Sequence, residues 1–155
     1  MTFLDRTTDV RRFRHWPGHI EADYIYTSGI AGETFFRELR ESGRILGVRC
    51  PQCGTQWLPP KLFCETCFRE TTDWVEAPAT GQVEAASVVH VDAKGKPLDS
   101  PEVWALIRFA GFKGGFVHRL LVDPRKARAG LRVHPILKPR SERVGAITDI
   151  VGFGP

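Results

Sequence analysis

The sequence lacks the features that mark membrane and secreted proteins. Its 155 residues contain no run of about 18 apolar residues, so we expect no membrane-spanning helix. The opening stretch, MTFLDRTTDVRRFRHWPGH, is charged throughout and has no apolar core of a secretory signal. We therefore expect a cytoplasmic protein whose thiols are reduced. A content of 42% hydrophobic and 26% charged residues is that of an ordinary globular protein.

The common catalytic motifs are also absent. There is no His-Glu-x-x-His, no Gly-x-Gly-x-x-Gly and no glycine loop for phosphate, and no serine lies in a Gly-x-Ser-x-Gly context. His15 and His19 flank Pro-Gly and are expected to be loop residues, whereas three further histidines fall in predicted strands: His90, His118 and His134. We expect no catalysis by this chain alone.

The net charge does not exclude any of the main classes of binding partner. The formal charge of +4 suits nucleic acid, an acidic protein or a phosphorylated ligand equally well. Four ionised cysteines and one divalent zinc would change it to +4 − 4 + 2 = +2. The function must be sought in the arrangement of particular residues.

All four cysteines lie in one segment, CPQCGTQWLPPKLFCETC, as two Cys-x-x-Cys pairs: Cys50, Cys53, Cys64 and Cys67. In a reducing compartment such pairs indicate a metal site, and four thiolates fill the coordination sphere of a structural zinc. Rubredoxin-type iron uses the same ligands and is the alternative. Gly54 suits a tight turn after the first pair, whereas no glycine follows the second, which we expect to be less regular.

Aromatic and basic residues surround the cysteines, and they leave two interpretations open. These residues are Trp57, Phe63, Phe68 and Trp74, with Arg49, Lys61 and Arg69. Interleaved aromatic and basic side chains can bind single-stranded nucleic acid. Alternatively, the aromatic rings cover a small core and the cations offset the negative charge of a zinc–thiolate cluster. We favour the second interpretation and consider nucleic acid unlikely.

The remaining pattern predicts a mainly β protein with a small N-terminal helix. A helix is expected over residues 32–42, ended by Gly43, and a strand over 44–49. After a linker at 71–81, five strands are predicted at 82–91, 103–110, 115–122, 131–138 and 145–153, separated by turns at 92–97 and 112–115. A helical turn begun by Asp123 and Pro124 and ended by Gly130 lies between the third and fourth strands.

Five strands with a helical turn in that place indicate a barrel of the OB type. The fold class is thus a zinc ribbon followed by a five-stranded OB-type barrel. We expect three parts: an N-terminal arm and amphipathic helix at 1–43, the zinc ribbon at 44–78, and the barrel with its C-terminal tail at 79–155.

These segments resemble a known family, the zinc-ribbon plus OB-fold proteins associated with acyl-CoA enzymes. The resemblance covers residues 24–155, and its motifs are YIYTSGIAGETFFRELRESGRILGVRC, the cysteine segment, W-V-E-x-P-x-T-G-Q-V, VWALIRFAGFKGGFVHRLL and the terminal D-I-x-x-F. The two knuckles are common, but their order with Pro-Pro, the tryptophan and the barrel strands is specific. The family resemblance implies that the zinc ribbon is rubredoxin-like.

The resemblance implies a function without catalytic residues in this chain. Members of the family are similar to non-catalytic partners of thiolase-fold enzymes, such as thiolases, hydroxymethylglutaryl-CoA synthases and sterol side-chain aldolases. It therefore implies a hetero-oligomer with a thiolase-fold catalytic subunit and a part in binding coenzyme A or acyl-CoA. Lys61 and Arg119 are the expected contacts to coenzyme A, and a solvated surface cation is the alternative for each.

Overall fold

The structure is a computed structural model that describes residues 8–12 and 26–155. His15 and His19 therefore lie outside the described residues. The helical elements are η1 (Val10–Arg12), α1 (Gly29–Glu41), η2 (Pro124–Lys126), η3 (Arg140–Glu142) and η4 (Ile147–Asp149). The strands are β1 (Leu46–Arg49), β2 (Gln56–Leu58), β3 (Asp73–Glu76), β4 (Gly81–Val91), β5 (Pro97–Arg108), β6 (Phe112–Gly114), β7 (Phe116–Arg119), β8 (Arg132–Leu137) and β9 (Ile150–Gly154). No helix in these described ranges is long and apolar enough to cross a membrane.

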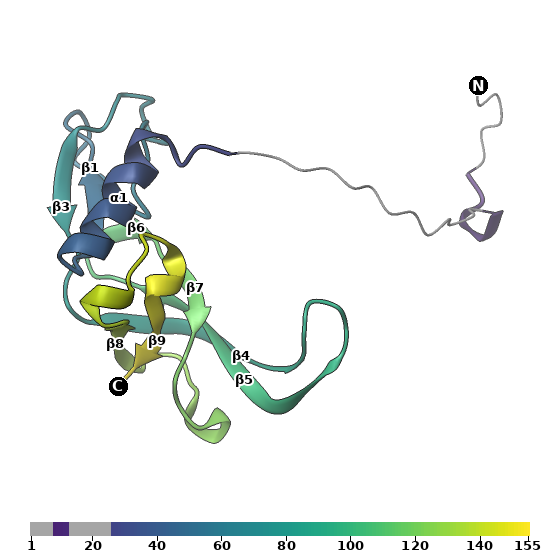
Figure 1. Cartoon of the computed structure of the whole chain (residues 1–155). Helices are drawn as coiled ribbons and strands as arrows, with labels where there is room; N and C mark the ends of the chain where they lie inside the picture. Colours follow the sequence, from purple (N-terminus) through teal and green to yellow (C-terminus); the bar gives the residue numbers. More distant parts are fainter. Residues whose placement is uncertain (1–7, 13–25) are drawn as a thin grey trace.

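Helix α1 confirms the predicted amphipathic helix, although it begins three residues earlier. Its apolar side, with Phe35 and Leu39 almost fully buried, faces the core. Gly43 has a φ of 72°, and its N–H donates to the carbonyl oxygens of Glu38 and Leu39. This left-handed ending satisfies carbonyl groups that the last helical turn leaves free. The helix lies against β1 and η4 and so contacts both parts of the molecule (Figure 1).

The zinc ribbon is a four-stranded sheet in the order β3-β1-β2-β6. β3 pairs antiparallel with β1 along all four residues of each strand, so the prediction of a linker at 71–81 is wrong for 73–76. β6 pairs parallel with β2, so the predicted turn at 112–115 is also wrong for its first three residues. β6 lies in the connection between β5 and β7, and it therefore joins the ribbon to the barrel through backbone hydrogen bonds.

The second sheet has the order β7-β5-β4-β8-β9, and each neighbouring pair is antiparallel. Its two edges meet where Leu120 forms a parallel bridge with Phe153 and the N–H of Leu121 donates to the Phe153 carbonyl at 2.7 Å. The sheet therefore closes into a barrel, which confirms the OB-type prediction. Asp123 caps η2 by accepting from the N–H of Arg125 at 2.8 Å, as the sequence predicted.

The core of the barrel contains a set of phenylalanine rings. Phe116 lies 5.9 Å from Phe35 of α1, 6.1 Å from Phe109 and 6.5 Å from Phe153, measured between ring centroids. Aromatic pairs at these separations add to the stabilisation from buried area. Because Phe35 belongs to this set, the helix is part of the barrel's core.

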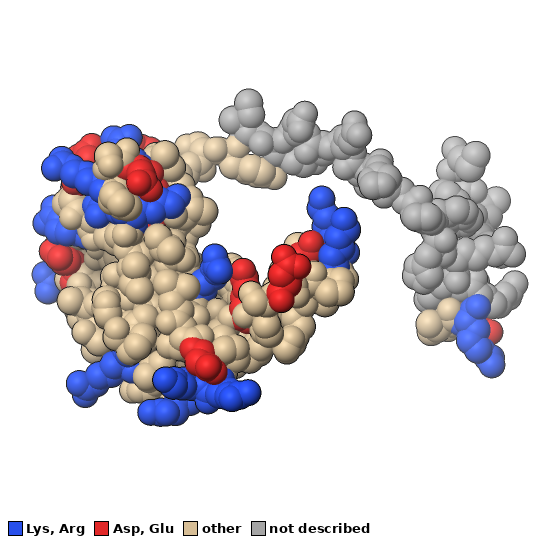
Figure 2. Space-filling model, turned by 60° about the horizontal axis from the view of Figure 1, so that its bottom comes forward, with Lys and Arg blue, Asp and Glu red and all other residues tan. Residues whose placement is uncertain are grey.

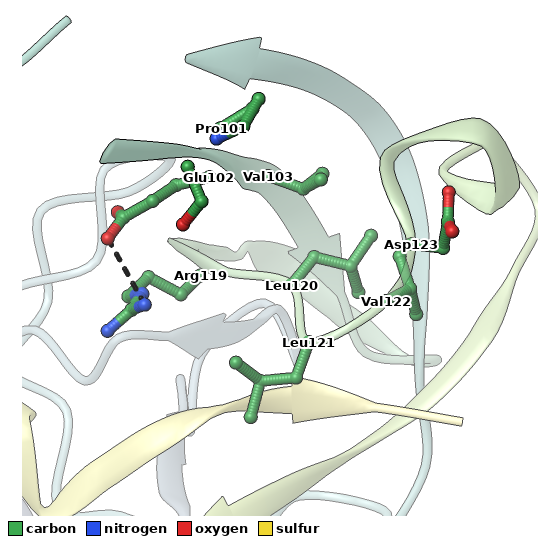
Figure 3. A pocket seen from close by; sticks show the side chains of 9 residues that line it. Pro101, Glu102, Val103, Arg119, Leu120, Leu121, Val122 and Asp123 are labelled. Carbon is green, nitrogen blue, oxygen red and sulfur yellow. Dashed lines mark ion pairs between the residues drawn. The ribbon is translucent and has the colours of Figure 1, made fainter. Parts of the chain in front are cut away.

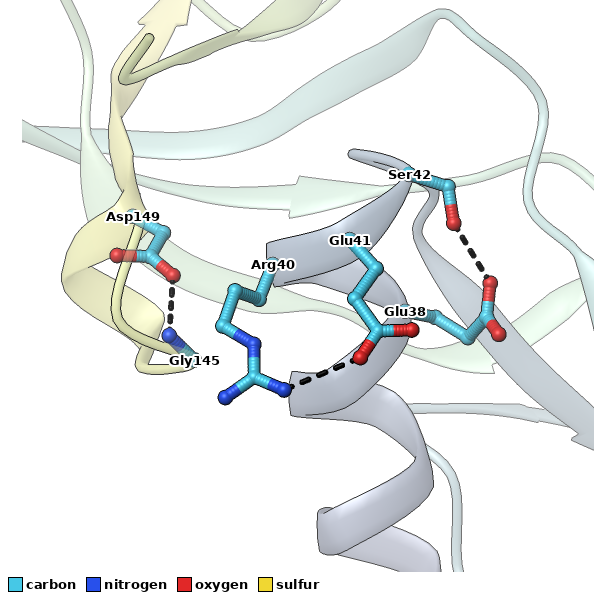
Figure 4. Close-up of polar contacts among 6 residues, drawn as sticks. All are labelled: Glu38, Arg40, Glu41, Ser42, Gly145 and Asp149. Carbon is cyan, nitrogen blue, oxygen red and sulfur yellow. Dashed lines mark hydrogen bonds and ion pairs between the residues drawn. The ribbon is translucent and has the colours of Figure 1, made fainter. Parts of the chain in front are cut away.

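The last predicted strand, 145–153, is only partly correct. Its first half forms the 3-10 helix η4, and extended structure begins at Ile150. The cause is Asp149, a fully buried carboxylate that accepts from the N–H groups of Val144, Gly145 and Ala146 at 3.0, 2.7 and 3.2 Å. Figure 4 shows this carboxylate turned toward Gly145, which lies beside Arg40 of α1. The turn that wraps around it cannot also be a strand.

Candidate metal centre and adjoining surfaces

The two Cys-x-x-Cys pairs form matching turns. The N–H of Cys50 donates to Thr55, and the N–H of Gly54 donates back to Cys50, both at 2.9 Å. In the second turn, the N–H of Cys64 donates to Arg69 and the N–H of Phe68 donates back to Cys64, both at 2.8 Å. The expectation that the second pair is less regular is therefore wrong.

Phe68 adopts an unfavourable backbone conformation in the second turn. It takes the position of Gly54, and its φ of 57° is close to the 71° of that glycine. Among the residues of 8–12 and 26–155, Phe68 is the one non-glycine with a positive φ. Its side chain is 81% exposed, so packing does not compensate for the unfavourable backbone.

The turns bring the four sulfur atoms together within 4.8 Å of one another. The Sγ atoms of Cys50 and Cys67 lie 3.4 Å apart, and those of Cys53 and Cys64 lie 3.6 Å apart. Four ligands at about 2.3 Å from a tetrahedral zinc lie about 3.8 Å apart. The four thiols therefore fit a zinc ion, and the fold gathers all four sequence-predicted ligands at one point.

The surroundings of the thiols also suit a bound cation. Burial raises the pKa of Cys64, but N–H groups of Thr66, Trp57 and Cys67 lower it to about 6. The amide of Arg69 lowers the pKa of Cys67, yet burial and the neighbouring thiols raise it to about 12. The Cys64 thiol thus ionises readily and the Cys67 thiol does not, because several negatively charged sulfur atoms repel one another when no cation lies between them.

Trp57 provides a further test of the fit. Its indole nitrogen is buried and has no hydrogen-bond partner among the described residues. It nevertheless lies near enough to the Cys64 thiol to lower the pKa of that group. A thiolate bound to metal is a natural acceptor for such a donor. Trp57 and Trp74 pack with Val48 around the cysteines, which confirms that these two rings cover a small core.

The other predicted aromatic and basic residues behave differently. Phe63 and Phe68 are 55% and 81% exposed, so the prediction that they cover the core is wrong. Arg49 forms an ion pair with Asp73, with Nη2 and Oδ2 2.6 Å apart, and it is therefore not free to offset the charge of the thiolates.

Of the two expected coenzyme A contacts, Lys61 lies in the loop after β2 and Arg119 lies in the barrel, and each is paired with a carboxylate. Lys61 forms an ion pair with Glu65, and its Nζ lies 4.6 Å from the centre of the Trp57 ring. Arg119 ends β7, and its Nη2 lies 3.1 Å from Oε1 of Glu102. A phosphate would have to compete with these carboxylates, since both cations are already partly neutralised.

Arg119 also lines a cavity of about 330 Å³ between β5 and the chain that follows β7. Figure 3 shows Arg119 directed at Glu102 on one side of this cavity, with apolar side chains farther along it. The apolar lining consists of Pro101, Val103, Leu120, Leu121 and Val122. The sequence contained no signal for this cavity, because its walls come from strands that pair only in the folded barrel.

The histidines in the strands behave as the sequence predicted. His90, His118 and His134 lie in β4, β7 and β8. His118 is 9% exposed, its ring lies 5.7 Å from that of Phe153, and burial lowers its pKa. Its Nδ1 accepts from the N–H of Arg119 at 2.9 Å. His118 is thus a packed barrel residue.

Fold and site together define a zinc-ribbon and OB-fold protein. Residues 37–73 match the family model of the ChsH2 rubredoxin-like zinc ribbon domain, and residues 74–136 match that of the ChsH2 C-terminal OB-fold domain. The chain is 30% identical over 106 residues to a DUF35 domain-containing scaffold protein of Methanocaldococcus jannaschii, which covers 66% of this chain and 74% of that relative. The chain therefore belongs to the DUF35 family, in agreement with the resemblance read from the sequence.

Two solved structures are similar to the whole arrangement. A DUF35 family protein of unknown function from Sulfolobus solfataricus has a TM-score of 0.61 and 29% identity, covering 70% of this chain and 78% of that one. A chain of the Ltp2-ChsH2(DUF35) aldolase has a TM-score of 0.58 and 27% identity, covering 79% of this chain and 93% of that one.

Proposed function

We propose that this chain is the zinc-binding accessory subunit of a thiolase-type acyl-CoA enzyme complex. The observation that carries the proposal is the similarity to a chain of the Ltp2-ChsH2(DUF35) aldolase, which extends over 93% of that chain and includes both the ribbon and the barrel. In the complex that we propose for this chain, the catalytic residues belong to a thiolase-fold partner, and the two kinds of subunit form a hetero-oligomer. The accessory chain acts in the cytoplasm.

The metal in this proposal is a structural zinc. Cys50, Cys53, Cys64 and Cys67 hold one ion per chain, and the ion supplies cross-linking of the two turns. Four sulfur ligands leave no open coordination position for a substrate. The ribbon has only a small core around Val48, Trp57 and Trp74, so metal binding contributes much of its stability.

The chain's second contribution is to the binding of coenzyme A. Lys61 and Arg119 contact its phosphate groups, and this binding energy positions the reacting thioester in the partner. The structure keeps both cations partly exposed, with side-chain exposures of 34% and 46%. Each contact requires that the cation share its carboxylate partner or leave it.

For the reaction itself we propose thiolytic cleavage of benzoylsuccinyl-CoA to benzoyl-CoA and succinyl-CoA, a step of anaerobic toluene degradation. The chain would then correspond to the small subunit of benzoylsuccinyl-CoA thiolase. The support is the resemblance of residues 24–155 to the accessory subunits of thiolase-fold enzymes.

The experiment that tests the proposal is co-purification of this chain with whatever enzyme is encoded beside it, followed by mass determination of the complex; we expect that enzyme to have a thiolase fold. We expect a stable complex that cleaves an acyl-CoA with free coenzyme A, whereas neither polypeptide does so alone. Full thiolytic activity of the isolated chain would contradict the proposal. Binding of single-stranded nucleic acid at micromolar concentration and physiological salt, measured by fluorescence anisotropy, would favour the nucleic-acid alternative.

A further inference from the structure

Strands β4 and β5 extend far beyond the barrel. β4 pairs with β8 only at Gly81 and Gln82, and β5 pairs with β7 only from Trp104 to Ile107. Beyond these points the two strands pair with each other alone, and no third described strand borders residues 84–91 or 97–103. We call this two-stranded projection, residues 84–103, the arm (Figure 1).

One face of the arm is apolar and hollowed. It encloses about 520 Å³, and the lining residues are Val89, Val91, Asp92, Ala93, Leu98, Glu102 and Trp104. Val91 and Trp104 are 48% and 37% exposed in the isolated chain. A two-stranded hairpin that leaves its apolar side chains in water is only marginally stable. The face is therefore suited to being covered by another molecule.

The hollow continues onto the barrel through Glu102. This carboxylate accepts from the indole nitrogen of Trp104 at 3.1 Å and pairs with Arg119, so it borders both the hollow and the cavity beside β7. Figure 2 shows the arm standing away from the barrel, with acidic side chains on the side that faces the barrel and basic ones at the tip. The covered area would thus run from the arm to the apolar cavity wall.

The charges on this surface select the occupant. The ionisable residues that line the hollow, Asp92 and Glu102, are both acidic. A second copy of this chain would bring the same two carboxylates to the hollow, and like charges repel. A second copy of this chain is therefore a poor fit, and a segment with apolar side chains and a cation is a good one.

We propose that the arm clasps a segment of the catalytic partner subunit, and that this segment presents apolar side chains flanked by a lysine or arginine. The inference rests on the proposed function, because it takes the partner subunit from it. The apolar side chains fill the space between Val91, Leu98 and Trp104, and the cation shares Glu102 with Arg119. The arm thus gives the complex an attachment point separate from the zinc ribbon.

The test compares three variants in binding to the purified thiolase-fold subunit by biolayer interferometry. Val91→Lys places a cation in the hollow, Val91→Ile keeps it apolar, and Val144→Lys adds the same charge at a site that is 68% exposed and lines neither cavity. We expect Val91→Lys to raise the Kd about tenfold or more. Val91→Ile and Val144→Lys should leave the Kd within about twofold of the wild type.

Each outcome decides between the two proposals. If the wild-type chain binds the subunit and Val91→Lys binds equally well, the arm proposal is overturned and the accessory function stands. If the wild-type chain does not bind the subunit at all, the accessory function and the arm's occupant both fail. If light scattering shows a dimer of the isolated chain that Val91→Lys dissociates, the occupant is a second copy and the arm proposal is overturned. Unchanged thermal unfolding of Val91→Lys shows that any loss of binding is not a loss of fold.

Discussion

Gly47 and Phe112 are in direct contact where the zinc ribbon joins the barrel. A β-carbon at position 47 would lie 2.4 Å from Cε1 of Phe112 and 2.6 Å from the carbonyl oxygen of Trp57. Gly47 belongs to β1, and Phe112 begins β6, the strand that the barrel contributes to the ribbon sheet. The absence of a side chain at position 47 lets the phenylalanine ring lie on the ribbon, so the two parts share one packed joint.

Gly47→Ala should therefore destabilise the protein. Neither neighbour can move easily, because one is a ring fixed in a strand and the other is backbone, so we expect a loss of about 1–3 kcal/mol in the free energy of unfolding. Chemical denaturation measures it. The double variant Gly47→Ala/Phe112→Ala is the control, since removing the ring should recover part of the loss of Gly47→Ala. A double-mutant cycle with no coupling energy would contradict this contact.

The metal prediction concerns all four cysteines equally. Cys→Ser at position 50, 53, 64 or 67 should abolish the soluble fold, because metal binding supplies about 10–16 kcal/mol of apparent folding free energy in small zinc-binding peptides. Elemental analysis of the wild-type protein should give one zinc per chain. Thr66→Ala, an exposed position in the second turn, is the control and should keep both fold and zinc. One equivalent of iron with a reddish colour would instead support an electron-transfer protein.

Phe68 allows a test of stored backbone strain. Phe68→Gly should raise the free energy of unfolding by about 1 kcal/mol relative to Phe68→Ala, because a left-handed conformation costs an L-residue about 1–2 kcal/mol and costs glycine little. Phe68→Ala is the matched control, since it removes the ring but keeps the strained backbone. Thermal unfolding of the zinc-bound variants compares them. Equal stability of the two variants would show that the turn relaxes without a glycine.

The parts of the fold that the sequence predicted are those set by local patterns. The cysteine spacing, the cap at Asp123 and the helix ending at Gly43 each depend on residues a few positions apart. β3 and β6 were missed because each consists of three or four residues that become extended only when they pair with β1 and β2. The pairing, and not the intrinsic preference of the residues, decides such short strands.

The candidate site was also predictable from the sequence only in part. The spacing of the cysteines predicted which atoms would meet. The position of Glu65, four residues after Lys61, could have indicated their ion pair, whereas nothing near Arg119 in the sequence indicated that Glu102 would pair with it. Asp149 was visible only as part of the D-I-x-x-F motif, and its role depends on three amide groups in a turn. A polar residue in an apolar run is the one signal that could have revealed it, since a buried carboxylate requires donors.

Asp149 gives a pH-dependent prediction. Burial raises the pKa of its carboxyl, but the amides of Val144, Gly145 and Ala146 lower it more, so the pKa in the folded state lies below that of the unfolded chain. A lowered folded pKa stabilises the protein above the unfolded value of about 4, and this stabilisation is lost as the pH falls through the folded pKa. Asp149→Asn should cost about 2–3 kcal/mol at neutral pH, and less in acid.

Denaturation of the Asp149→Asn variant across pH 2–7 checks this expectation. Asp99→Asn, at an exposed position of the arm, is the control and should follow the wild-type curve. If the stability difference between Asp149→Asn and the wild type were the same at every pH, the ionised carboxylate could not be what orders residues 144–149.

The coenzyme A contacts can be tested in the reconstituted complex. Lys61→Ala and Arg119→Ala should each raise KM for coenzyme A by about ten- to a hundredfold, because a charge-assisted phosphate contact contributes roughly 1.5–3 kcal/mol. If the contact is equally strong in the ground and transition states, kcat should hardly change. Arg37→Ala on the exposed side of α1 is the control and should leave both constants unchanged.

The carboxylate partner of Lys61 sharpens this test. Glu65→Gln removes the negative charge that competes with a phosphate for the Lys61 ammonium, so it should lower KM for coenzyme A while Lys61→Ala raises it. The change should be small, about two- to fivefold, since an exposed ion pair is worth only about 0.2–1 kcal/mol. Opposite shifts from the two members of one ion pair would identify Lys61 as a direct contact, because general damage to the ribbon would raise KM in both variants. If KM stayed constant in the Lys61, Glu65 and Arg119 variants alike, the coenzyme A path would have to lie elsewhere on the complex.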